Sequence, residues 1–261
     1  MDNGLIKPII EINTFHELLE TQKKVWGLED IDVVPTHLLK VVSDEMGPKA
    51  VILGYFLDDE IIGFTLTLPT SNPQEVIMHM LAVATDFQRK NVGYSLMLKL
   101  RELMLSQNID KIFWTFDPLE SVNANLYIRK LGGIITRHSV DYYGPIESRI
   151  HSGFPTDRFI VEWNIRDKHV ENRIKDSVKG NCSSSQLNCP CADSDIQFVE
   201  IPLNIQELKK EDISGAIKIR IETRSKFEEI IEKSNYVGLD FIYDKINRKG
   251  SYIFKKPLSK L

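Results

Sequence analysis

Cysteine is scarce in this chain of 261 residues, and the three that it has lie close together, at Cys182, Cys189 and Cys191. An odd, clustered set without an export signal does not suit a disulfide framework, so we expect a cytoplasmic protein. The three thiolates could bind zinc together with His169, but their spacing is irregular, and we expect no metal. No apolar run approaches the ~20 residues that a membrane span requires. The formal charge of −4 argues against a nucleic-acid partner, because phosphate contacts need a basic surface.

The chain does have the composition of a globular protein, with 42% apolar and 27% charged residues. Strand and helix signals alternate from the start, which predicts a mixed α/β layer structure. Thr14 and Glu17 form the pattern of a capping box for a helix that runs to about Trp26. Asp58–Asp59 lies between two strand candidates and predicts a hairpin turn.

Composition changes sharply after Trp163, where charged and then Ser/Asn/Cys-rich residues replace the apolar periodicity. We interpret residues 166–195 as a linker or a surface excursion, with disorder as an alternative. Regular patterns return after it, so the predicted domains are residues 1–165 and a small C-terminal α/β extension at residues 196–261.

The most informative stretch runs from Leu81 to Met97, where an apolar strand leads through a short polar loop into a helix. Helix-start amides lack partners and the helix dipole favours negative charge, so this arrangement can bind an anion. Gly93 lets the backbone approach a ligand closely, and Asn91 is one of the few residue types that accept a left-handed conformation. Arg89 and Lys90 add positive charge. The loop therefore predicts a diphosphate site, and a plain strand–turn–helix is the alternative.

This segment resembles the GNAT superfamily of acyl-coenzyme A N-acyltransferases, whose signature is Gln/Arg-x-x-Gly-x-Gly/Ala behind a strand that ends in a Leu-x-Val-like segment. Here the signature reads Gln88-Arg-Lys-Asn91-Val-Gly93, behind Leu81-Ala-Val83, and it departs from the family at Asn91. Trp114-Thr-Phe-Asp-Pro-Leu119 and the C-terminal part around Tyr236 are similar to a less studied subgroup of about this length. The resemblance covers most of the chain apart from the linker. It implies a GNAT fold, a twisted mixed and mostly antiparallel sheet flanked by helices, with the C-terminal extension attached.

The resemblance also implies a cofactor, acetyl-coenzyme A or another acyl-coenzyme A, and the residues that bind it. Loop amides would hold the diphosphate, the edge of the fourth strand would bind the pantetheine arm, and an asparagine in a later helix would contact that arm. These cofactor residues are Leu81, Ala82, Val83, Gln88, Arg89, Lys90, Asn91, Val92, Gly93, Tyr94 and Asn123. Asn123 or Ser121 can instead cap the helix in which they lie.

Acyl transfer needs a base to accept a proton from the amine and an acid to protonate the leaving thiolate. His79 precedes Leu81 by two residues on the same strand face and titrates near neutrality, so we expect it to be the base. A satisfied, partly buried histidine is the alternative. The resemblance places an acidic tyrosine four residues before Gly132, where this chain has Ile128. We therefore expect Tyr127, one position away, to protonate the thiolate, with water, Tyr142 or Tyr143 as alternatives.

Three residues are candidates for binding the acceptor, namely Trp114, Asp117 and Arg158. Asp117 can bind a cationic amine or simply form a turn before Pro118. Arg158 can bind a carboxylate, or pair with Asp157 for structural reasons. Arg220 and Arg224 lie four apart on one helix face, and we expect that face to be solvated.

These observations predict an enzyme that moves an acetyl or other short acyl group directly from acyl-coenzyme A to the amine of a small molecule or amino acid. An N-succinyl-type amino-acid acyltransferase and a non-catalytic coenzyme A-binding module are the alternatives. The sequence does not decide whether the chain forms a homodimer.

Overall fold

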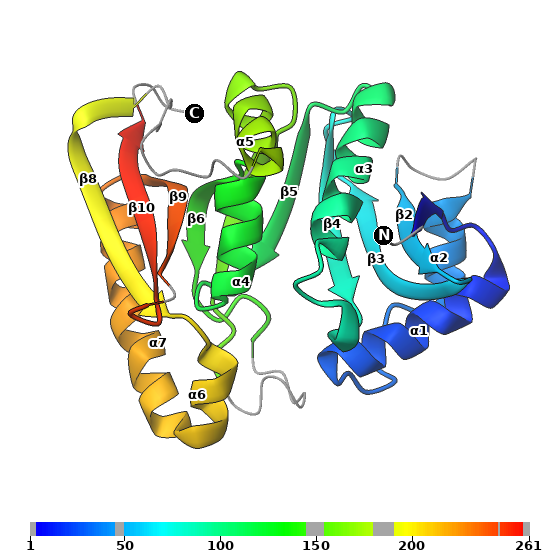
Figure 1. Ribbon diagram of the computed structural model, residues 1–261, viewed down its shortest axis with the longest axis horizontal. Coiled ribbons are helices and arrows are strands. Elements are labelled where there is room, and N and C mark those ends of the chain that lie inside the picture. The colour runs from blue at the N-terminus through cyan, green and yellow to red at the C-terminus, as the bar shows by residue number, and fades with distance from the viewer. Residues whose placement is uncertain (1–3, 45–49, 145–153, 180–190, 245, 258–261) are drawn as a thin grey trace. The chain divides into compact units, whose positions relative to one another are not determined.

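The structure is a computed structural model that describes residues 4–44, 50–144, 154–179, 191–244 and 246–257. The chain divides into two compact units, the first reaching Trp114 and the second beginning at Thr115. Figure 1 labels the helices and strands of each. This division falls inside residues 1–165, the segment that was expected to be one domain.

The described strands of the first unit neighbour one another in the spatial order β1-β2-β3-β4-β5. Its strands are β1 (Leu5–Pro8), β2 (Ile52–Leu57), β3 (Glu60–Pro69), β4 (Glu75–Val83) and β5 (Lys111–Phe116), whose last two residues belong to the second unit. Neighbours are antiparallel, except that β4 and β5 run parallel. Helices α1 (Ile12–Trp26), α2 (Thr36–Ser43) and α3 (Val92–Ser106) and the short 3₁₀ helix η1 (Thr85–Phe87) complete the unit.

The core of the first unit lies between the sheet and α1 and α2. Its buried side chains come from all three elements and include Phe15, Leu18, Leu39, Phe64 and Leu66. Burying such a set of apolar side chains is the main force that holds helices to a sheet.

Two local predictions for the first unit had opposite outcomes. Asp58 and Asp59 both have positive φ, 48° and 66°, and join β2 to β3 as the predicted hairpin turn. The capping box is wrong, because α1 begins at Ile12 with Glu11 in the cap position. Thr14 therefore lies inside the helix that it was expected to start.

The second unit contains a sheet in the order β7-β6-β9-β10-β8, with all described neighbours antiparallel. Its strands are β6 (Ile134–Ser139), β7 (Arg158–Asn164), β8 (Cys191–Pro202), β9 (Val237–Asp244) and β10 (Lys249–Pro257). Its helices are α4 (Ser121–Ala124), the π-helical η2 (Asn125–Lys130), α5 (Lys168–Val178), α6 (Ile205–Glu211), α7 (Ile213–Phe227) and the π-helical η3 (Glu228–Lys233). The predicted mixed, mostly antiparallel sheet flanked by helices is confirmed.

Helix α5 lies in the segment that was predicted to be a linker. Val170 is buried in it, and Arg173 forms an ion pair with the fully buried Asp240, with 3.0 Å between Nη2 and Oδ2. Ser177 donates a hydrogen bond to the carbonyl oxygen of Lys130. The linker prediction is thus wrong for residues 168–178, which are an ordered part of the second unit.

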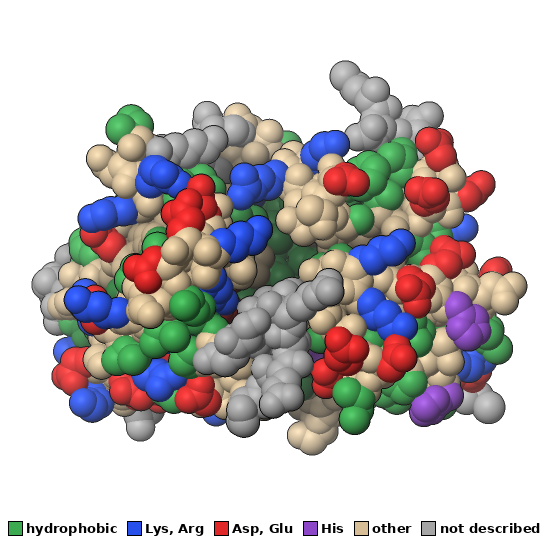
Figure 2. Space-filling model, turned by 90° about the horizontal axis from the view of Figure 1, so that it is seen from below, with side chains coloured by type: hydrophobic (Ala, Val, Ile, Leu, Met, Phe, Trp, Pro, Cys, Tyr) green, Lys and Arg blue, Asp and Glu red, His purple; other side chains and the backbone are tan. Residues whose placement is uncertain are grey.

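The surface agrees with the balanced composition of the chain. Basic and acidic side chains are interspersed on the face that Figure 2 shows. No helix in the described ranges is both long and apolar enough to cross a membrane. Cys182 and Cys189 lie outside the described residues, and so does the side chain of Cys191, so the cysteine cluster has no structural account.

Candidate functional site

Strand β4 separates from its parallel neighbour after three residues. The described pairing with β5 covers only Glu75–Ile77, opposite Lys111–Phe113. The pairing with β3 continues to Val83. In the described part of the first unit, the stretch from Met78 to Val83 therefore has a strand on one edge only.

The direction of the backbone groups on β4 follows from its bonds to β3. The N–H of Ala84 donates to the carbonyl oxygen of Ile62 at 2.9 Å. The backbone N–H and C=O groups of successive residues in a strand point to opposite edges. Those of Ala82 and Ala84 therefore point to β3, and those of Leu81 and Val83 point to the other edge. That edge offers N–H and C=O groups that can pair with an extended ligand.

A β-bulge lies at His79. Leu66 and Thr67, which are adjacent in β3, pair with Met80 and Met78, so His79 is left without a partner in β3. Bulges of this kind turn a side chain away from the regular ladder and are frequent next to active sites. The imidazole is exposed, while its neighbours Met78 and Ala82 are buried. The surrounding protein still displaces water from the ring, and this desolvation lowers the pKa of His79 from its ordinary value, 6.5.

The turn between β4 and α3 has an unusual backbone. Arg89 and Asn91 have positive φ of 63° and 64°, and Gln88, Arg89, Lys90 and Asn91 are all exposed. The predicted left-handed conformation of Asn91 is confirmed. Asn91 can take the place of a glycine there because its short polar side chain tolerates this conformation.

Helix α3 begins directly after this turn, at Val92. Its first turn contains no acidic residue, and Asn91 makes no side-chain cap bond to it. The first described bond into the helix is donated by the N–H of Ser95 to the oxygen of Asn91. Helix geometry gives the amides of Val92 and Gly93 no carbonyl of a preceding turn, and the helix dipole adds positive potential around them. An anion is the partner that suits this helix start.

Gln88 connects the turn back to β4. Its side-chain amide donates to the carbonyl oxygen of Val83 at 3.1 Å, and its backbone N–H donates to Thr85 at 3.3 Å. Gln88 thus fixes the turn, and neither its amide nor the oxygen of Val83 is free to bind a ligand. The groups left on the strand edge are the N–H and C=O of Leu81 and the N–H of Val83.

In the second unit, Tyr127 lies in a π-helical segment, η2. This geometry removes the one-residue offset noted in the sequence, because a π turn has one residue more than an α turn. Tyr127 lies five residues before Gly132. In a π-helix this spacing gives about the same angle around the helix axis as a spacing of four residues gives in an α-helix. The ring packs against Phe116, with centroids 5.5 Å apart, and burial raises the pKa of the phenol well above its usual range. The hydroxyl therefore keeps its proton near neutrality.

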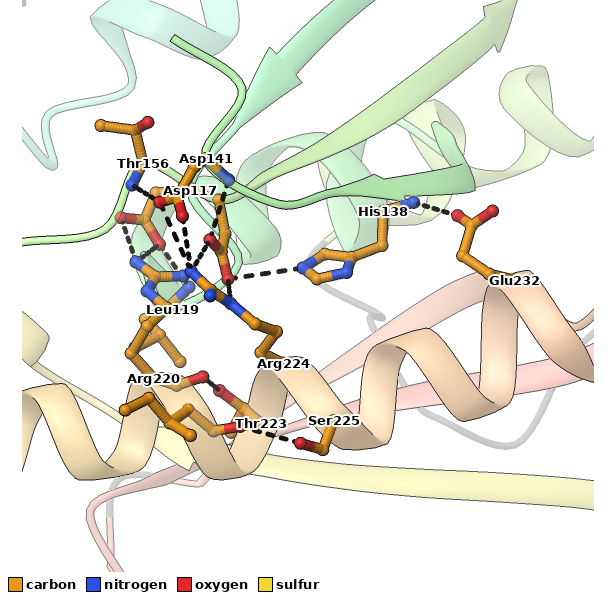
Figure 3. Close-up of polar contacts among 12 residues, drawn as sticks. Asp117, Leu119, His138, Asp141, Thr156, Arg220, Thr223, Arg224, Ser225 and Glu232 are labelled. Carbon is orange, nitrogen blue, oxygen red and sulfur yellow. Dashed lines mark hydrogen bonds and ion pairs between the residues drawn. The ribbon is translucent and has the colours of Figure 1, made fainter. Parts of the chain in front are cut away.

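Asp117 does not offer its carboxylate to an acceptor. Nη2 of Arg220 lies 2.5 Å from both carboxylate oxygens, and the N–H of Leu119 donates to Oδ1 at 2.8 Å (Figure 3). These contacts fit the turn role, and Arg220 occupies the carboxylate that the predicted substrate role would need. The guanidinium lowers the pKa of Asp117 even though burial alone would raise it.

The predicted solvated face of Arg220 and Arg224 is also wrong. Arg220 is 1% exposed, and Arg224 binds Asp157 through two nitrogens, at 2.6 and 2.9 Å. Asp157 therefore pairs with Arg224 and not with Arg158. The signal that sequence reasoning missed is the match of two arginines four apart with two aspartates on distant segments.

Arg158 has a different environment. Its guanidinium lies over the ring of Tyr143, 5.1 Å from the centroid, and it has no carboxylate partner within the described residues. The hydroxyl of Tyr143 lies 3.4 Å from Oγ1 of Thr115. Arg158 thus remains a candidate for binding an anionic group.

Two further candidates have less exposed positions. Trp114 is 1% exposed and belongs to the core, so its side chain presents no surface to an acceptor. Asn123 is half-buried in the first turn after Ser121, and Glu120 holds the cap position without a side-chain cap bond. The alternative in which Asn123 or Ser121 caps the helix is wrong.

A sequence model of the acetyltransferase (GNAT) family matches residues 13–132. This range includes β4, the turn with its left-handed residues, α3, and the π-helical segment that carries Tyr127. No curated protein matches the chain in sequence.

Solved acetyltransferases share the fold. The ribosomal-protein-S18-alanine N-acetyltransferase from Escherichia coli superposes with a TM-score of 0.50 at 15% identity, over 62% of this chain and 94% of that chain. A probable acetyltransferase from Staphylococcus epidermidis has the same score and identity, over 61% and 98%. A GNAT-family acetyltransferase from Streptococcus pneumoniae has a TM-score of 0.50 at 13% identity, over the same shares. At these identities the likeness concerns the fold, and the rest of this chain has no counterpart in those structures.

Proposed function

Residues 13–132 form an acetyltransferase domain of the GNAT family, and on that premise we propose that the protein moves an acetyl or other short acyl group from acyl-coenzyme A to the amine of a small molecule. The observation that carries this proposal is the junction of β4 and α3. A strand edge that pairs with no strand beyond Ile77 in the described ranges leads there into an exposed turn and a helix start without a side-chain cap.

Each part of that junction suits one part of the thioester. The amides of Val92 and Gly93 bind the diphosphate, and Arg89 and Lys90 add charge around it. The backbone groups of Leu81 and the N–H of Val83 pair with the amides of the pantetheine arm as an added strand would. Ala82 contributes packing only, because it faces β3 and is buried.

The reaction is a direct transfer. The amine nitrogen attacks the thioester carbonyl carbon, the C–S bond breaks, and an amide bond replaces it. His79 accepts the proton that the amine loses, directly or through a water molecule, and its lowered pKa keeps the imidazole neutral and ready to do so. Tyr127 returns a proton to the coenzyme A thiolate, a role in which its raised pKa keeps the hydroxyl protonated until the thiolate forms.

An amino acid is the second candidate acceptor, with an acetyl or a succinyl donor. Arg158 favours it, because a guanidinium without a carboxylate partner in the described part of the chain can bind a substrate carboxylate through two hydrogen bonds.

The test is the release of free coenzyme A thiol from acetyl- or succinyl-coenzyme A in the presence of pooled amines, amino acids and peptides. We expect thiol release that requires one of these acceptor pools. Thermal shift with coenzyme A measures binding alone, so binding without turnover in any pool supports a non-catalytic module.

Gly93→Val is the matched loss-of-binding variant. A side chain there blocks the approach of the diphosphate to the helix start, so both the thermal shift and the thiol release disappear. Wild-type affinity in this variant would mean that the diphosphate lies elsewhere.

A further inference from the structure

The C-terminal extension, residues 196–261, contacts the connection between β5 and α4, which runs from Asp117 to Glu120, and also the first residue of α4, Ser121. Arg220 of α7 binds the carboxylate of Asp117, and the hydroxyl of Tyr252 of β10 donates to the oxygen of Pro118 at 2.8 Å. The side-chain amide of Gln206 in α6 donates to Glu120. The fourth contact is a hydrogen bond from Oγ of Ser121 to the carbonyl oxygen of Leu203, which follows β8.

These contacts are shielded from water. Arg220 is 1% exposed, Tyr252 is fully buried, and Asp117 is 8% exposed. Hydrogen bonds and ion pairs in such surroundings are geometrically restrictive, because a buried group that loses its partner is costly. Burial also raises the pKa of Tyr252 well above its usual range, so its hydroxyl remains a donor to Pro118.

The connection has one turn of its own, in which the N–H groups of Leu119 and Glu120 donate to Asp117. Helix α4 has only four residues before the π-helical segment begins, and its cap residue, Glu120, makes no side-chain cap bond. The hydroxyl of Ser121 is directed to Leu203 instead of to the helix start. The position of α4 therefore depends on the extension.

A row of aromatic rings runs from the same region to the extension. Tyr127 packs on Phe116 at 5.5 Å, Phe116 on Phe159 at 5.8 Å, and Phe159 on Tyr252 at 5.2 Å, all between ring centroids. Tyr252 thus contacts both the polar connection and the last ring of this row. One residue of the extension is coupled in two ways to the segment that carries Asn123 and Tyr127.

We propose that the C-terminal extension is a built-in positioning device for α4 and the π-helical segment, with Arg220 and Tyr252 as its positioning residues. The expected effect on turnover rests on the proposed function. The expected effect on the connection between β5 and α4 is independent of that function, because these contacts can be tested without any substrate.

The test uses Tyr252→Phe and Arg220→Lys in the full chain. Tyr252→Phe removes only the hydroxyl and keeps the ring contacts, while Arg220→Lys keeps a positive charge beside Asp117. Tyr243→Phe on the adjacent strand β9 and Lys218→Ala on the exposed side of α7 are matched controls, since neither has a described contact with the connection.

We expect faster hydrogen–deuterium exchange in residues 117–131 of both variants and unchanged exchange in the core strands. We also expect kcat to fall by about tenfold or more, because small misplacement of a reacting group is costly, while KM for the acyl donor changes less than about twofold. The two control variants match the wild type in both measurements.

Unchanged exchange in residues 117–131 overturns the inference, and so does faster exchange throughout the chain with kcat lowered only in proportion to the folded fraction. A wild type without turnover contradicts the proposed function instead, and the exchange data then decide on the positioning device by themselves.

Discussion

The exposed turn before α3 can be tested by replacing Asn91, whose φ is +64°. An L-residue with a Cβ costs roughly 1–2 kcal/mol in this left-handed region, and asparagine and glycine largely avoid the cost. Asn91→Gly should therefore keep the turn, and it restores the glycine that the family signature has at this position. Asn91→Val puts a β-branched side chain at the same φ, so the free protein relaxes out of the turn, and coenzyme A must restore the turn on binding.

The expected loss follows from that cost. If binding must supply roughly 1–2 kcal/mol, the Kd for coenzyme A rises about 5- to 30-fold. Isothermal titration of the wild type and the two variants with coenzyme A measures the change directly. Asn108 is the matched control, because it follows the other end of α3, is exposed and has φ +56°. Asn108→Val should lower the free energy of unfolding by a similar amount and leave the Kd unchanged. Equal affinities for Asn91→Val and the wild type would refute the idea that this turn holds the diphosphate.

Three further changes test the chemistry and the fold. His79→Ala should lower turnover at pH 7 by about 10²–10⁴-fold with coenzyme A affinity intact. In the wild type, kcat/KM should fall as the pH drops through a pKa below 6.5, since the protonated imidazole cannot accept a proton. If His79→Ala keeps the wild-type turnover rate and still shows the fall of kcat/KM at low pH, His79 is not the base. Tyr127→Phe keeps the buried ring and removes the acid, so kcat should fall at constant KM in steady-state assays, and an unchanged kcat leaves protonation to water. Arg173→Met removes the nearer of the two arginines that pair with the buried Asp240, which then keeps Arg129, at 4.0 Å, and the N–H of Phe241, at 2.8 Å. Denaturant unfolding should show a loss of about 3–5 kcal/mol, and a loss below about 1 kcal/mol would mean that α5 is dispensable.

The parts of the fold that sequence could predict are those decided by local chemistry. Two adjacent aspartates between apolar strands give the hairpin at Asp58–Asp59. A polar turn between a strand and a helix gives the left-handed Asn91. Both outcomes depend on the conformational preferences of one or two residues.

The parts that sequence could not predict depend on partners elsewhere in the chain. The bulge at His79 exists only in relation to Leu66 and Thr67 on the neighbouring strand. The ion pair of Asp117 joins residues that are 103 positions apart. Neither relation leaves a periodic signal in one segment of sequence.

Helix α5 was missed for a related reason. Its buried side consists of Val170 and Arg173, so half of what it buries is a charged residue that hydrophobic periodicity does not register. Arg173 is buried because Asp240, on β9, neutralises it. A composition that reads as polar linker therefore folds as part of the second unit.

Hydrogen–deuterium exchange of the wild type with and without coenzyme A tests the central claim most directly. The account predicts slower exchange at the amides of Leu81, Val83, Val92 and Gly93, the groups that β4 and the start of α3 offer to the thioester carrier. Binding that leaves these amides unprotected, or no binding at all, would contradict it.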